Sequence, residues 1–310
     1  MMGDDFGLSD AGALVLVSNA GGDSGAGGTF GVGGGGDGGG GSAGAPACAP
    51  GQFAEPTLLS ELTIDGKLRG PALSSDGLTL YFAVESDVSP GDLYRATRAD
   101  LTSPFAAPVS ITELNTASAE LTPHLSSTSG ALYFSSDRLG NEDIWRAMPG
   151  LYGAFSPPEP MTTVNSSEAD FLPCLSPDGL RLLLGSNREG ASGSSDLWVA
   201  TRPTLTGTFA AASPQSELNT VARDEGATLT GDDLNVFLTS DRPGGAGDLD
   251  IWYSSRYNLQ SNFSPPVNVT ELNSPAEESD VHVSREGNEI FFSSARTGEP
   301  RLWHATRACP

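Results

Sequence analysis

The stretch Leu132-Tyr-Phe-Ser-Ser-Asp-Arg138, followed by Asp143-Ile-Trp145, decides the fold because its parts recur along the chain. Each of the four tryptophans ends a similar tripeptide, and a fifth copy ends in tyrosine: Asp92-Leu-Tyr94, Asp143-Ile-Trp145, Asp196-Leu-Trp198, Asp250-Ile-Trp252 and Arg301-Leu-Trp303. The intervals between these aromatic residues are 51, 53, 54 and 51 residues. A period of this length is typical of the four-stranded blades of β-propellers.

A turn signal precedes a short apolar run upstream of each aromatic residue. The clearest copies are Ser75-Asp76-Gly77 before Leu80-Tyr-Phe82 and Pro177-Asp178-Gly179 before Leu182-Leu-Leu184. Asp-Gly between two β-rich runs favours a hairpin, because glycine adopts a positive φ at little cost. Each repeat is therefore predicted to begin with a β-hairpin.

A fourth strand is predicted after each aromatic residue, from a phenylalanine and an aliphatic residue nine positions later. The copies are Phe53 to Leu62, Phe105 to Leu114, Phe155 to Val164, Phe209 to Leu218 and Phe263 to Leu272. The first copy precedes the first hairpin, and none follows the last third strand. The sequence therefore predicts an all-β fold, a five-bladed propeller with four-stranded blades. Its last blade is closed by the N-terminal strand, which removes exposed sheet edges.

The repeat pattern resembles the PD40 (WD40-like) repeats of the TolB-like propeller family over about residues 52–308. The similarity is greatest at Ser135–Arg138 with Asp143–Trp145, and at Thr239–Gly245 with Asp250–Trp252. This resemblance implies the propeller fold. It leaves the function open, because propellers host many unrelated activities.

Residues 1–47 differ sharply in composition from the rest, with 18 of the 39 glycines and no Lys or Arg. They cannot bury enough apolar surface to offset chain entropy, so we expect a disordered Gly-rich tether at 1–47 and the propeller at 48–310. The apolar run Ala11–Val17 is too short to span a membrane, and acids precede it where a signal peptide has Lys or Arg. The tether resembles the stalk that follows a bacterial secretion or lipoprotein signal, so a start further upstream would allow a lipid anchor.

The charge of the chain limits its partners. The net charge is −23, and residues 48–310 contain 34 acids and 16 bases. Nucleic acids and anionic membrane surfaces need clustered Lys and Arg, so neither is an expected partner. We expect a monomer that binds a protein or a glycan.

The positions of two cysteines suggest a covalent link across the closure. Cys48 precedes the predicted closing strand and Cys309 follows the last third strand, so a closed ring should make them neighbours. A Cys48–Cys309 disulfide would stabilise the fold by roughly 5 kcal/mol on the chain-entropy estimate. It would also imply an oxidising compartment, and hence a periplasmic, cell-surface or secreted protein. The alternative is two free thiols in ordinary tail segments, while Cys174 is expected to be a plain buried residue.

Four blades carry an acid three residues before a recurring position that is often proline, and Leu68 takes this place in the remaining blade. The acids are Glu120, Asp170, Asp224 and Glu278. Pseudo-symmetry would place them in a ring near one mouth of the channel, flanked by Glu168, Glu225, Glu277 and Asp280. Such a ring suits a ligand or a hard cation such as Ca²⁺. The alternative, which we favour, is that each carboxylate accepts backbone N–H bonds from its neighbouring loop.

Three bases depart from the repeat: Lys67 and Arg69 in blade 1, and Arg301 in blade 5. If they share a face, they are the best anion-binding candidates on an otherwise acidic domain. His124 and His282 hold equivalent positions, but no third histidine joins them in register, so no three-histidine metal set is indicated. The sequence contains neither a Gly-x-Ser-x-Gly elbow nor a His-Glu-x-x-His motif.

Two functions stay open. The first is a non-enzymatic binding or scaffold module of the TolB-like type, which recognises a protein or glycan outside the cytoplasm. The second is a carbohydrate-active hydrolase or lyase with carboxylates at the channel mouth, one of them with a raised pKa. An enzyme should break the repeat in one or two blades to place unlike groups, whereas a scaffold can keep its blades alike. The regular repeats and the missing motifs favour the binding module.

Overall fold

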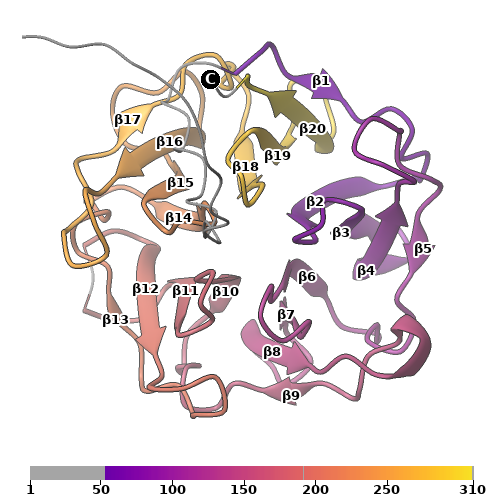
Figure 1. Cartoon of the computed structure of the whole chain (residues 1–310), viewed down its shortest axis with the longest axis horizontal. Helices are drawn as coiled ribbons and strands as arrows, with labels where there is room; N and C mark the ends of the chain where they lie inside the picture. The colour runs from indigo at the N-terminus through magenta and orange to yellow at the C-terminus, as the bar shows by residue number, and fades with distance from the viewer. Residues whose placement is uncertain (1–52, 191, 309–310) are drawn as a thin grey trace, which may run out of the picture. The chain divides into compact units, whose positions relative to one another are not determined.

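In the computed structural model, which describes residues 53–190 and 192–308, five antiparallel sheets of four strands stand in a ring (Figure 1). Blade 1 contains β2 (Lys67–Leu73), β3 (Thr79–Ser86), β4 (Ser89–Thr97) and β5 (Val109–Ser110). Blade 2 contains β6 (Glu120–Leu125), β7 (Leu132–Ser136), β8 (Asp143–Ala147) and β9 (Glu159–Pro160). Blade 3 contains β10 (Asp170–Leu175), β11 (Arg181–Ser186), β12 (Asp196–Thr201) and β13 (Ser213–Pro214). Blade 4 contains β14 (Asp224–Leu229), β15 (Asn235–Ser240), β16 (Asp250–Ser255) and β17 (Val267–Asn268). Blade 5 contains β18 (Glu278–Val283), β19 (Glu289–Ser294), β20 (Arg301–Thr306) and β1 (Thr57–Leu58).

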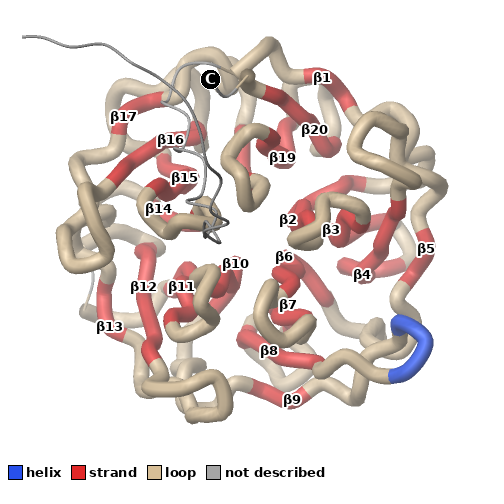
Figure 2. Tube along the Cα trace, in the orientation of Figure 1, coloured by secondary structure: helices blue, strands red, loops and turns tan. Residues whose placement is uncertain are grey.

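The predicted five-bladed, all-β fold is confirmed, and so is its closure. In blade 5 the strand order is β1-β20-β19-β18, with Thr57 opposite His304 and Leu58 opposite Trp303. The N-terminal strand therefore supplies the outermost strand of the last blade. Loops join the strands, and the described chain has one short 3₁₀ turn, η1 (Leu151–Gly153; Figure 2).

Several predictions concern parts of the chain outside the described residues. These are the tether at residues 1–47, the domain boundary at residue 48, and both cysteines of the predicted bridge, Cys48 and Cys309. Within the described ranges, no helix has the length and apolar character needed to cross a membrane.

The local signals act largely as predicted. Gly77 has a φ of 73° at the first hairpin turn, and the Asp76 carboxylate accepts the backbone N–H of Leu78 at 3.0 Å. The fourth strands are shorter than the pattern suggests: β5 has two residues, and Phe105 and Leu114 lie on either side of it. These two side chains are 5% and 1% exposed, so they anchor the segment by packing and not by ladder hydrogen bonds.

The core lies between neighbouring blades. One of its clusters joins Leu183 and Leu197 of blade 3 to Val236, Leu238 and Trp252 of blade 4. The repeated aromatic residue, here Trp252, therefore fills the space between two sheets, which explains why an aromatic residue recurs once per blade. This packing fixes the five first strands, β2, β6, β10, β14 and β18, around the centre of the ring (Figure 1).

Candidate functional site

The four predicted site acids are enclosed by protein, each with 0% exposure: Glu120, Asp170, Asp224 and Glu278. Each accepts a backbone N–H from the residue four positions earlier. In blade 4, Asp224 also accepts the hydroxyl of Ser240 and the guanidinium of Arg242, both at 2.5 Å. The four carboxylates therefore accept backbone N–H bonds from their neighbouring loops, as in the alternative to a ligand site. The hydrogen bonds occupy both carboxylate oxygens of Asp224, which leaves a ligand no exposed oxygen there.

An arginine completes this unit by lying over the tryptophan of its blade. The distances from guanidinium carbon to ring centroid are 4.8 Å for Arg138 and Trp145, 5.1 Å for Arg188 and Trp198, 5.4 Å for Arg242 and Trp252, and 4.8 Å for Arg296 and Trp303. Blade 1 has Leu68 opposite Val84 where the others have the acid opposite the serine, and both are buried in the core. Blades 2 to 5 thus have a buried acid paired with an arginine where blade 1 has a buried apolar residue. This replacement points to a structural role for the buried acid and its arginine.

A ring of residues with a left-handed backbone conformation narrows the channel. Each first strand has a bulge two residues after the acid position, with φ of 59° at Gly70, 47° at Thr122, 52° at Leu172, 64° at Gly226 and 54° at Asp280. These residues line a cavity of about 30 Å³. That volume holds only about two water molecules. A larger ligand therefore does not fit inside this part of the channel.

Three acids that break the repeat lie at the mouth where the first strands begin, and we call Glu142, Glu225 and Asp280 the acidic mouth. Glu142 lies in the loop between β7 and β8 and accepts the hydroxyl of Ser135 at 2.5 Å. Glu225 is the second residue of β14 and accepts the hydroxyl of Ser195 at 2.9 Å. Asp280 is the bulge residue of β18, and its carboxylate accepts a backbone N–H from blade 1 at 3.2 Å.

Burial is the main cause of a raised pKa at all three acids. Burial and the neighbouring carboxylates, including Asp280 and Glu225, raise the pKa of Glu142 to about 7, although a serine hydroxyl opposes the change. Burial also raises the pKa of Glu225, against the nearby charge of Arg223, and that of Asp280, against Arg69. The acidic mouth thus contains a carboxyl group that keeps a proton near neutral pH.

The repeat itself carries a signal for these residues. The position before each repeated tripeptide holds Gly91, Glu142, Ser195, Leu249 and Pro300, so only blade 2 has an acid there. Sequence reasoning misses Glu142 because the loop before it varies in length between blades. It places Glu225 and Asp280 only as flanking residues, since their neighbours in register are not acidic.

The next layer of the channel is formed by His124, Cys174, Thr228 and His282. Nε2 of His124 accepts the backbone N–H of Leu175 from the next blade at 3.1 Å, so this ring is neutral with its proton on Nδ1. Burial lowers the pKa of His124 to about 4, and burial with the charge of His124 lowers the pKa of His282 to about 3. Cys174 is buried, as predicted, and burial raises the pKa of its thiol to about 12. This layer has no reactive thiolate and no charged histidine at neutral pH.

The three predicted anion-binding bases divide between two places. Arg69 pairs with Glu85 at 2.9 Å and with Glu277 at 3.8 Å, near the acidic mouth. Lys67 and Arg301 line a separate cleft of about 560 Å³ between blades 1 and 5, which we call the outer cleft. The structure therefore brings two of the three bases together.

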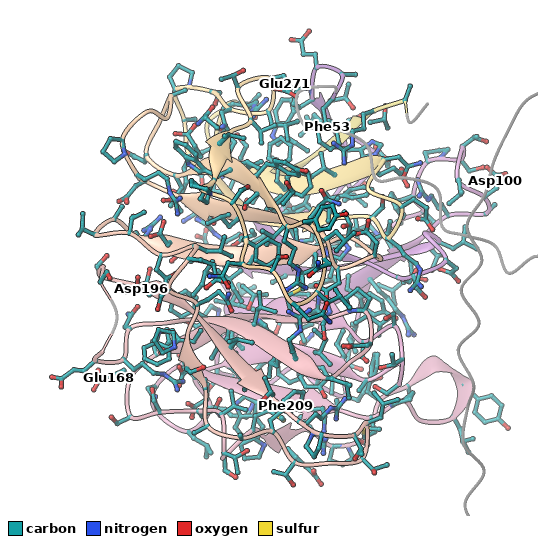
Figure 3. All side chains as sticks on the ribbon, turned by 60° about the vertical axis from the view of Figure 1, so that its left-hand side comes forward. Phe53, Asp100, Glu168, Asp196, Phe209 and Glu271 are labelled. Atoms are coloured by element: carbon teal, nitrogen blue, oxygen red, sulfur yellow. The ribbon has the colours of Figure 1, made fainter. Side chains whose placement is uncertain are left out.

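The acids that flank the predicted ring do not assemble a metal site. Glu168 is exposed and extends away from the ring into solvent (Figure 3). Across residues 53–190 and 192–308, no group of three or more His, Cys, Asp and Glu side chains could hold a metal ion. The described residues therefore do not fit the calcium ring that the repeat suggests.

No family model and no curated protein matches this sequence. Among solved structures, the catalytic domain of a GH62 α-L-arabinofuranosidase from Coprinopsis cinerea is 9% identical, with a TM-score of 0.57 over 84% of this chain and 99% of that one. An endo-arabinase from Bacteroides thetaiotaomicron is 14% identical, with a TM-score of 0.56 over 83% of this chain and 98% of that one. TolB from Acinetobacter baumannii is 17% identical, with a TM-score of 0.43 over 78% of this chain and 55% of that one. The similarity to the two hydrolases shows the fold alone.

Proposed function

We propose that this chain is a non-enzymatic binding propeller of the TolB-like PD40 type, which recognises a partner outside the cytoplasm at its acidic mouth. One observation carries this proposal: Glu142, Glu225 and Asp280 break the repeat at three different positions, yet they lie close enough for their charges to interact. A scaffold without a site could keep its blades alike there. The PD40-like repeats support the family, and the proposed Cys48–Cys309 bridge would require an oxidising compartment.

The chemistry of the acidic mouth favours a cationic group as the ligand, and we propose a Lys or Arg side chain of a protein partner. The pKa of Glu225 is raised although Arg223 lies 3.7 Å away, and the pKa of Asp280 is raised although the charge of Arg69 opposes it. Glu142 forms no ion pair among the described residues, so a cation placed among the three half-buried carboxyl groups would favour their charged forms. Binding would drive the proton off Glu142. The affinity is therefore expected to rise as the pH is raised from 6 to 8, through the pKa of about 7.

Calorimetric titration with hexalysine at 0.15 M salt tests this proposal. We expect the pair Glu142→Gln and Asp280→Asn to weaken binding at least tenfold. The matched control is Asp100→Asn with Glu159→Gln, which removes the same formal charge from exposed positions and should change the affinity less than twofold. Equal losses in the two double variants would show attraction to net charge only and would contradict a site at the mouth.

A second function is favoured by one observation, the pKa of about 7 at Glu142 beside two further carboxyl groups. A glycoside hydrolase needs a carboxylic acid that is protonated at its working pH together with a carboxylate. Arabinan and a chromogenic arabinofuranoside are suitable substrates to test, because two structural neighbours are an endo-arabinase and an arabinofuranosidase. Hydrolysis should fall as the pH rises above 7 and should be lost in Glu142→Gln. This pH dependence is opposite to that expected for cation binding, so the two functions can be separated.

A further inference from the structure

The outer cleft lies where blade 1 departs from the other blades. Blades 2 to 5 have a loop of at least six residues between their second and third strands, whereas in blade 1 the strands β3 and β4 continue into a tight hairpin in which Ser86 pairs with Ser89. At the same boundary, Arg301 replaces the aspartate that begins the third strand of blades 2 to 4. This extended hairpin forms one side of the cleft of about 560 Å³. This size is within the roughly 300–1,000 Å³ of small-molecule sites.

Two bases, one from blade 1 and one from blade 5, line this cleft. The backbone N–H of Leu68 donates to the carbonyl of Pro300 at 3.0 Å, which places the neighbouring residues Lys67 and Arg301 on adjacent strands. Arg301 is half-buried, and one guanidinium nitrogen donates to the carbonyl of Ile64 at 2.9 Å, so its position is fixed.

Neither base has a carboxylate partner among the residues that the structure describes. Glu85 is opposite Lys67 in the sheet, but its carboxylate pairs with Arg69 at 2.9 Å. Lys67 is exposed and therefore available to a ligand. The domain has an excess of acids, so a cleft with two bases that lack carboxylate partners differs from the rest of the domain in its charged groups.

The rest of the lining limits what anion can bind. Asp65, Asp87 and Glu299 line the same cleft, and all three are exposed. These carboxylates would repel a compact anion such as phosphate or sulfate. They would accept hydrogen bonds from a ligand in which hydroxyl groups surround each carboxylate.

We propose that the outer cleft binds a carboxylated sugar, a uronic acid residue of an acidic glycan. The sugar carboxylate pairs with the guanidinium of Arg301 and the ammonium of Lys67, while its hydroxyl groups donate to the rim carboxylates. This site shares none of its lining residues with the acidic mouth. The two proposals can therefore fail independently.

Calorimetric titration with trigalacturonate at low salt tests the outer cleft. We expect Lys67→Ala and Arg301→Lys each to weaken binding at least tenfold, the second because a lysine cannot make the paired contact of a guanidinium. The control Arg285→Ala removes an exposed base remote from this cleft and should change the affinity less than twofold. The methyl ester of trigalacturonate keeps its hydroxyl groups but loses the charge, and it should bind at least tenfold more weakly.

The proposal would be overturned by the absence of trigalacturonate binding at millimolar concentration, by equal binding of the methyl ester, or by unchanged binding in Lys67→Ala. Binding of glutamate in place of trigalacturonate would also overturn it, because that would identify an amino-acid site. The side chain of Lys67 forms no hydrogen bond with a described residue, so Lys67→Ala keeps the test valid even if the Arg301 variant fails to fold. Glu142→Gln serves as a further reference, and it should leave trigalacturonate binding unchanged.

Discussion

The buried ionic unit of blade 4 provides a quantitative test of what holds a blade together. The Asp224 carboxylate is 0% exposed, and the side chain of Arg242 is 8% exposed. Arg242 also donates to the carbonyl of Leu218 at 2.7 Å and lies over the ring of Trp252. Replacing Arg242 by serine leaves the carboxylate buried without its counter-charge. Breaking such a pair lowers the free energy of unfolding by about 3–5 kcal/mol.

Blade 1 shows how the same space is filled without charge, and this supplies the second half of the test. The variant that combines Asp224→Leu, Ser240→Val and Arg242→Ser copies the residues of blade 1, and we expect it to recover most of the loss in Arg242→Ser. The control is Arg146→Ser, which breaks an exposed pair with Glu159 and should cost about 0–1 kcal/mol. Urea denaturation followed by tryptophan fluorescence measures all three. The reasoning is refuted if Arg242→Ser costs less than 1 kcal/mol, or if the triple variant is no more stable than the single one.

Three further predictions concern the channel and the closure. His124 and His282 have pKa values of about 4 and about 3 in the folded protein, below the usual 6.5. The unfolded chain therefore takes up protons first as the pH falls below 6.5. Each histidine should cost on the order of 3 kcal/mol of stability by pH 4. Thermal melts should show a weaker acid dependence in His124→Gln, and an equal dependence would contradict the assignment. Phe53→Ala removes a side chain that is 7% exposed at the closure and should lower the free energy of unfolding by about 3–5 kcal/mol in urea, whereas a loss below 1 kcal/mol would show that the closure is not anchored there. If Cys48 and Cys309 form a bridge, intact mass should be two hydrogens lower before reduction, and Cys309→Ser should lower the melting temperature; free thiols by mass would contradict the bridge.

The sequence predicts the five-bladed fold more completely than the candidate binding sites, because the fold follows from the repeat. The tryptophan spacing and the displaced Phe53 segment identify five blades and their closure, because every blade packs similar residues at equivalent positions. The burial of Asp224 depends on Arg242, which lies eighteen positions later in the chain. The Ser-x-Arg pattern marks this ion pair, but the pattern is recognised only after the structure has shown the pair. Glu142 cannot be found from a consensus, since it departs from one.

The outer cleft illustrates a second limit. Lys67 and Arg301 belong to the first and last blades, and only the closure of the ring brings them together. They line the same cleft because the backbone N–H of Leu68, next to Lys67, donates to the carbonyl of Pro300, next to Arg301. Sequence reasoning can name both bases as departures from the repeat, but it cannot decide that Arg69 pairs elsewhere. That choice depends on Glu85, which could have paired with either neighbour.

The direction of β1 in the last blade has a mechanical consequence. Thr57 lies opposite His304 and Leu58 opposite Trp303, so the start of β1 lies beside the end of β20. A force that pulls the two ends of the domain apart therefore loads the hydrogen bonds of this seam one after another, as in a zipper, and not all at once, as in shear. The ring should open at this seam at low force, while each of the other four blades is a continuous segment that the force reaches only after the seam has parted.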